Sequence, residues 1–358
     1  MHGAPETMAR MPMAALAEQH AVISPASGSR RPGVTLKIHP ITQRHSGRQL
    51  AYRPLRLAAL SPVLPRVKMS CVPIARATDA KLLAVSDLHV TYSKNREFVE
   101  SLRPESESDW LLVAGDVGEM AADIEWALRL LSRRFATVVW APGNHELWTC
   151  RADPVQLRGE PRYLHLVRLC RRLGVVTPED PYPVWGGPGG PAVIAPLFLL
   201  YDYSFVPSGA MTAADGLARA YEAGVVCTDE ILLHPDPYPS RQAWCRARVV
   251  TTERRLADLD PRVPTVLMSH FPLIREPTLR LRYPEFAAWC GTTRTFDWHV
   301  RFNATAVVYG HLHIPLTTWH DGVRFEEVSL GYPEERQQRD VPAVALRQIL
   351  PADGSSGD

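Results

Sequence analysis

Five apolar stretches of this 358-residue chain each run into residues whose side chains can bind a metal ion. The first ends in Asp-Leu-His, the second in Gly-Asp, the third in Gly-Asn-His-Glu, the fourth in a single His and the fifth in Gly-His-Leu-His. Buried Asp and His side chains need polar partners, which an apolar core does not supply but a shared metal ion does. The pattern therefore predicts a metal centre, and its candidate residues are Asp87, His89, Asp116, Asn144, His145, His270, His311 and His313.

The residue types in this pattern favour a transition metal. His311 and His313 can converge on one site only where the backbone is extended or looped, because helical neighbours are three or four residues apart. Imidazole combined with carboxylate and amide oxygens suits Mn, Fe, Zn or Co better than Ca, and the sequence does not choose among these four metals. Taken singly, some candidates also have structural interpretations: His89 and Asn144 as turn residues, and Asp116 as a helix N-cap.

Predicted strands position these candidates, at residues 81–86, 110–114, 137–141, 265–269 and 306–309. Apolar residues at helical spacing predict helices at 121–135 and 163–173 between them. This alternation of strands and helices implies parallel crossovers and an α/β layered core. Such sheets present ligands at the carboxyl ends of their strands, where the candidate residues lie.

The series Asp-x-His, Gly-Asp, Gly-Asn-His-Glu, lone His and Gly-His-x-His resembles the calcineurin-like metallophosphoesterases, from Asp87 to His313. The resemblance implies an α/β fold, a β-sandwich of two mixed sheets flanked by helices with the metal site at the strand-end loops. It also implies two metal ions: Asp87, His89 and His313 would hold one, Asn144, His270 and His311 the other, and Asp116 would bridge both. His145 would lie outside the metal ligands, near the substrate.

Hydrolysis of a phosphate ester is the activity that this resemblance implies. A phosphate ester is anionic and repels hydroxide, so two divalent or mixed-valence ions would neutralise it and activate a bridging hydroxide. His145 would assist the leaving group as the catalytic residue. We expect a small soluble phosphomonoester or nucleotide-like metabolite as the substrate. The alternatives are a phosphodiesterase acting on a cyclic nucleotide or other diester, and a non-catalytic metal-bound scaffold that binds a protein partner.

Two insertions are predicted to determine the substrate, at about 202–263 and 275–300. Arg275, Arg280 and Arg282 could bind further phosphate or carboxylate groups. Tyr283 and Trp289 could stack on a ring. The alternative is that these arginines are solvated and the aromatic residues fill a small core. No substrate-binding residue is assigned, and Glu146 is interpreted either as a partner that orients a ligand or as a packing residue.

Composition and charge outside the five motifs indicate the domain organisation and exclude some classes of protein. Residues 1–77 combine 11 basic with two acidic residues and show no apolar periodicity, which predicts a disordered extension before a domain at 78–350 and a disordered tail at 351–358. The basic residues form no concentrated block, so we expect no nucleic-acid binding. The longest apolar run contains a proline and is too short to span a membrane. Six cysteines without a C-x-x-C pair indicate reduced thiols in a cytoplasmic protein. The pattern makes no prediction of oligomeric state.

Overall fold

The structure is a computed structural model, which describes residues 21–22, 79–206, 209, 212–338 and 346–352. The predicted disordered extension at 1–77 lies outside the described residues except for Ala21–Val22 (β1), which pairs antiparallel with Val225–Val226 (β7). Most of the predicted tail, residues 353–358, also lies outside them. Within the described part of the chain, no helix combines the length and apolar character needed to cross a membrane.

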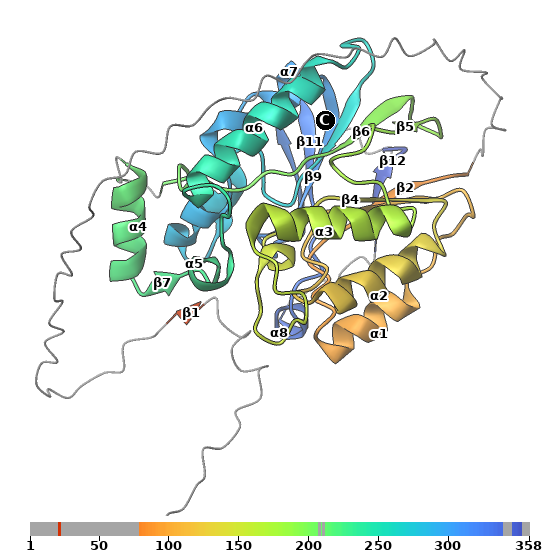
Figure 1. The fold of residues 1–358 in the computed structure, drawn as a ribbon. Coiled ribbons are helices and arrows are strands. Elements are labelled where there is room, and N and C mark those ends of the chain that lie inside the picture. Colours follow the sequence, from red (N-terminus) through yellow and green to blue (C-terminus); the bar gives the residue numbers. More distant parts are fainter. Residues whose placement is uncertain (1–20, 23–78, 207–208, 210–211, 339–345, 353–358) are drawn as a thin grey trace, which may run out of the picture. The chain divides into compact units, whose positions relative to one another are not determined.

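Two mixed sheets form the body of the fold, as predicted (Figure 1). The four-stranded sheet has the order β12 (Arg347–Leu350), β2 (Leu82–Val85), β3 (Trp110–Val113) and β4 (Thr137–Trp140). Only β12 is antiparallel to its neighbour in this sheet. The six-stranded sheet has the order β10 (Thr317–His320), β11 (Val323–Glu327), β9 (Ala304–Tyr309), β8 (Thr265–Met268), β6 (Ala192–Pro196) and β5 (Val184–Trp185). Its four central strands, from β11 to β6, are parallel.

The two sheets share a buried apolar layer. Alternate residues of the four-stranded sheet, such as Leu82 and Leu112, form one apolar cluster with Ile194, Val266 and Val308 of the six-stranded sheet. The residues between them along each strand belong to a second cluster, which includes the apolar faces of the flanking helices. Strands that are buried on both faces need apolar residues at every position. This is why the predicted strands show no alternation of polar and apolar residues.

Helices α1 (Ser93–Ser101), α2 (Ala121–Ser132) and α3 (Gly159–Arg172) lie beside the four-stranded sheet (Figure 1). In α2 the buried residues Ile124, Ala127, Leu128 and Leu131 recur at helical spacing and form the face that packs on the sheet. The predicted helices at 121–135 and 163–173 are thus confirmed, with ends that differ by up to four residues.

The two predicted insertions contain most of the remaining helices. Residues 202–263 include α4 (Ala213–Glu222), β7, α5 (Asp229–Leu232) and α6 (Arg241–Ala257). The hydroxyl of Ser240 caps α6 by accepting a hydrogen bond from the backbone N–H of Ala243. Residues 275–300 form the short helices η3 (Glu276–Arg280), η4 (Pro284–Trp289), η5 (Thr293–Thr295) and the start of α7 (Trp298–Arg301). Trp289 is fully buried among them, so it fills a core and does not stack on a ligand.

Arg162 of α3 connects the helix to the loops that follow β3 and β4. Its guanidinium is fully buried and forms an ion pair with Asp153, with 3.0 Å between Nη1 and Oδ2. It also donates hydrogen bonds to the carbonyls of Glu146 and Glu119, at 2.6 and 2.7 Å. With a further hydrogen bond to the carbonyl of Val155 at 3.1 Å, the side chain satisfies four acceptors.

We predict that Arg162→Met lowers the free energy of unfolding by about 3–5 kcal/mol, because it leaves the buried Asp153 carboxylate without its cation. Arg168→Met on the exposed face of the same helix is the matched control and should change stability by less than about 0.5 kcal/mol. Urea unfolding measures both. Equal effects of the two substitutions would show that the buried ion pair contributes nothing specific.

Candidate metal centre

Loops after five parallel strands bring the predicted residues to one edge of the sandwich. In the four-stranded sheet, the register aligns Val85, Val113 and Trp140, so the loops that follow them begin side by side. In the six-stranded sheet, Met268 pairs with Val308, and the loops of His270 and Gly310 follow directly. A bridge between Ser86, after β2, and Ser329, after β11, joins the two sheets at this edge. The sandwich therefore delivers all five motifs to one place.

The first group of donors consists of Asp87, His89 and His313. His313 Nε2 lies 3.0 Å from Asp87 Oδ1 and 3.3 Å from His89 Nε2. The other ring nitrogen of His313 lies 2.7 Å from Glu335 Oε2, on α8 (Pro333–Gln337), and this contact fixes the orientation of the ring. Asp87 accepts a hydrogen bond from the backbone N–H of His311 at 3.0 Å, which connects the two motifs.

The second group surrounds the Nε2 atom of His270. This atom lies 3.1 Å from Asn144 Oδ1, 3.2 Å from His311 Nδ1 and 3.3 Å from Asp116 Oδ2. The Nδ1 atom of His270 donates a hydrogen bond to the carbonyl of Ala114 at 2.9 Å, which turns Nε2 toward the other donors. Thus every residue predicted for the second metal faces one point.

His145 lies next to both groups. Its Nε2 atom is 3.8 Å from Asp116 Oδ2, and its ring centroid is 4.6 Å from that of His89. Its Nδ1 atom donates a hydrogen bond to Glu119 at 2.9 Å, and its ring stacks on Trp148. Burial alone would lower the pKa of His145, but the charges of Asp116 and Glu119 outweigh burial and raise it. The ring is thus held in place with its second nitrogen toward the donors.

The backbone of the donor loops is strained in a recurrent way. Asp87, His89, Asp116, His311 and His313 all have positive φ, between 40° and 71°. Such conformations cost about 1–3 kcal/mol for a residue with a side chain, and they persist where the surroundings impose them. Since five of the eight predicted residues share this feature, the loops are shaped to aim side chains at the site.

Two glycines allow the loops to approach each other. A Cβ atom at position 143 would lie 2.1 Å from Asp116 Oδ1, and one at position 310 would lie 1.9 Å from Ser86 Oγ. Any side chain at these positions would displace a donor loop. The glycines of the Gly-Asn-His-Glu and Gly-His-Leu-His motifs are therefore explained by packing against Asp116 and Ser86.

Besides Glu335, three acidic residues support the donors, and the sequence pattern did not identify two of these three. Glu146 accepts backbone hydrogen bonds from Asp116, Val117 and Gly143, each at 2.9 Å, so it fixes loops and does not orient a donor side chain. Glu119 and Asp229 were not predicted. Their partners lie 26 and 85 residues away in the sequence, and no local spacing indicates such contacts.

Asp229 positions the amide of Asn144. Its Oδ1 atom accepts hydrogen bonds from Asn144 Nδ2 at 3.0 Å and from the Trp148 indole N–H at 2.6 Å. Because Asp229 binds the nitrogen of the amide, the Asn144 oxygen must face His270. This fully buried carboxylate comes from α5 in the insertion at 202–263, so the insertion contributes to the candidate metal centre.

The buried carboxyls and imidazoles of the site shift one another's pKa. Burial opposes ionisation of Asp87 and Asp116, yet the adjacent histidines lower the pKa of both carboxyls below their usual value. Burial likewise opposes protonation of His270, but Asp116 and Asp87 raise its pKa to about 9. The pocket thus stabilises positive charge beside two buried carboxylates.

The donor set fits two transition-metal ions. Paired imidazole nitrogens about 3.2–3.3 Å apart, each pair next to a carboxylate oxygen, converge as ligands of a shared ion do. Asp116 approaches the second group directly. Its bridging role, the other ligand assignments and the role of His145 remain predictions.

The sequence profile of the calcineurin-like phosphoesterases matches residues 80–315. The chain belongs to this family and is a metallophosphoesterase that hydrolyses phosphoric esters.

Among individual proteins, the chain is 60% identical over 270 residues to the [acyl-carrier-protein] phosphodiesterase PptH of Mycobacterium tuberculosis, covering 75% of this chain and 83% of that relative. It is also similar to the crystal structure of phosphopantetheinyl hydrolase (PptH) from the same organism, with a TM-score of 0.76 and 58% identity. That match covers 78% of this chain and 98% of the solved chain.

We predict that Asp229→Ala weakens metal binding by roughly 10–100-fold, because Asn144 loses the acceptor that orients its amide. Asp229→Asn keeps one acceptor oxygen and should have a smaller effect. Glu222→Ala removes an exposed carboxylate from the same insertion and is the matched control. Metal content during titration with a chelator measures the affinity. Unchanged affinity in Asp229→Ala would contradict the positioning role.

Proposed function

We propose that this chain hydrolyses the phosphodiester that joins a phosphopantetheine arm to a side-chain oxygen of a carrier protein. The observation that carries the proposal is the 58% identity to a phosphopantetheinyl hydrolase over 98% of its solved chain. The curated relative is likewise named as a phosphodiesterase of acyl-carrier protein. These likenesses favour the diester alternative of the sequence analysis over a small monoester, and a protein substrate over a small molecule.

The residues that would hold the metals are those grouped by the structure. Asp87, His89 and His313 would bind one ion, and Asn144, His270 and His311 the other, with Asp116 between them. When bound, two such ions supply positive charge that offsets the anionic diester and activates water for attack.

His145 is the residue of the chain that acts on the leaving group. Its Nδ1–H is held by Glu119, so the proton available to the substrate is at Nε2, on the side of Asp116. The charges of Asp116 and Glu119 raise the pKa of His145, which favours the protonated ring that can donate to the leaving group. An alkoxide released from a carrier protein is a poor leaving group, and protonation in the transition state lowers its barrier. Stacking on Trp148 keeps the ring directed at the departing oxygen.

A carrier protein that bears the arm tests the proposed function. We expect metal-reconstituted protein to return the carrier to its unmodified mass and to release the arm, as measured by intact-protein mass spectrometry. A panel of phosphomonoesters is run in parallel. Turnover of monoesters with the modified carrier left intact would instead support the small-monoester interpretation.

Two substitutions separate metal binding from proton transfer. Asp116→Ala should lose metal and activity together, whereas His145→Ala should keep metal and lose activity by roughly 10²–10⁴-fold. The loss in His145→Ala should be smaller for a nitrophenyl ester, because nitrophenolate departs without a proton. His165→Ala on α3 serves as a control and should retain both properties. If His145→Ala loses metal as completely as Asp116→Ala, His145 is a ligand and not the acid.

A further inference from the structure

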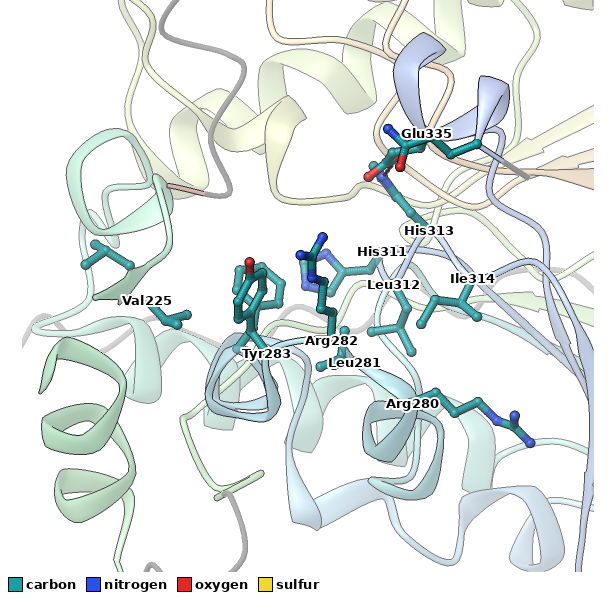
Figure 2. A pocket seen from close by; sticks show the side chains of 13 residues that line it. Val225, Arg280, Leu281, Arg282, Tyr283, His311, Leu312, His313, Ile314 and Glu335 are labelled. Atoms are coloured by element: carbon teal, nitrogen blue, oxygen red, sulfur yellow. Dashed lines mark hydrogen bonds and ion pairs between the residues drawn. The ribbon is translucent and has the colours of Figure 1, made fainter. Parts of the chain in front are cut away.

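A pocket of about 540 Å³ opens beside His311 and His313 (Figure 2). Its apolar wall includes Val225, Val226, Leu281, Tyr283, Leu312 and Ile314. These side chains come from β7 in one insertion, from the loop between η3 and η4 in the other, and from the Gly-His-Leu-His loop. The volume is in the range of pockets that enclose a ligand of drug-like size. Both insertions therefore contribute to one hollow next to the candidate metal centre.

This pocket adjoins the cleft over the metal centre. Phe286, His311 and His313 line both hollows, whereas His145 and Trp148 line only the cleft. A diester whose phosphate lies at the donors can place one substituent in the pocket. Its other substituent then lies on the side of His145.

The chemistry of the pocket matches a long neutral chain with amide groups. Arg280 and Arg282 border the apolar wall, and neither forms an ion pair with any residue in the described part of the chain. The Arg282 guanidinium lies 5.5 Å from the centre of the Tyr283 ring. A pantetheine arm has methyl and methylene groups that suit the apolar wall. Its amide carbonyls can accept hydrogen bonds from a guanidinium.

We infer that this pocket binds the pantetheine arm, with Arg282 as a recognition residue. The inference rests on the proposed function and specifies its substrate site. The oxygen of one water bonds to phosphorus, and the bond from phosphorus to the carrier oxygen breaks with its electron pair on that oxygen. His145 supplies the proton and regains one from the water. The products are pantetheine 4′-phosphate and the unmodified carrier.

Product inhibition tests the pocket without the carrier protein. The inhibition constants of pantetheine 4′-phosphate and inorganic phosphate are measured on hydrolysis of bis(p-nitrophenyl) phosphate. In the wild-type protein, the inhibition constant of pantetheine 4′-phosphate should be lower than that of phosphate by a factor of roughly ten or more. Val226→Trp fills the pocket, and Arg282→Ala removes the guanidinium that donates hydrogen bonds to the arm. Each substitution should therefore abolish most of this difference in inhibition. Val250→Trp on the exposed face of α6 and Arg133→Ala on the surface are the matched controls and should preserve it.

The outcomes separate the assignment of the pocket to the pantetheine arm from the proposed hydrolytic function. Equal inhibition by the two compounds in the wild-type protein would overturn this assignment, even if the carrier is cleaved. The enzyme would then recognise the carrier protein and not the arm. Stronger inhibition by adenosine 3′,5′-bisphosphate than by pantetheine 4′-phosphate would overturn the assignment in favour of a nucleotide site. If the carrier is not cleaved but the arm inhibits through Val226 and Arg282, the proposed function fails and the pocket stands.

Discussion

The carboxylate of Asp116 is the group on which the arrangement of the site depends. It accepts a hydrogen bond from the backbone N–H of His145 at 3.0 Å, and its other oxygen lies 3.3 Å from His270 Nε2. It also packs so closely on residue 143 that only glycine fits there. One side chain thus sets the separation of the loops after β3, β4 and β8. A buried carboxylate in this position needs positive charge around it, which explains why the neighbouring loops present imidazoles.

The chemistry and the recognition of substrate come from different parts of the chain. The donors lie on loops after strands of the sandwich, and the packed strands hold these loops in strained conformations. The pocket beside them is formed largely by segments inserted between these strands. Such a division allows one metal centre to act on different esters, because the walls can change while the donor loops remain.

Most of the fold and the candidate donors could be predicted from the sequence, because strand-end motifs are local signals. Apolar runs followed by Asp, Asn or His marked the five loops, and the structure brings those residues together. Of the supporting residues, Glu146 stood out in the sequence, but Glu119 and Asp229 could not be predicted, because they act through partners that only the tertiary structure brings near. The role of the aromatic residues in the insertion at 275–300 could not be predicted either. Its tryptophans looked the same in the sequence whether they lined a site or filled a core, and burial of Trp289 decides for the core.

The position of Asp229 limits how far the insertion at 202–263 can be treated as an exchangeable module. Engineers often transplant such loops between related enzymes in order to change the substrate. Here the transplanted segment carries the acceptor that sets the direction of the Asn144 amide, so an exchange alters the coordination sphere together with the substrate walls. A successful chimera must therefore retain a buried carboxylate at this point of α5, or supply Asn144 with another acceptor from the recipient scaffold.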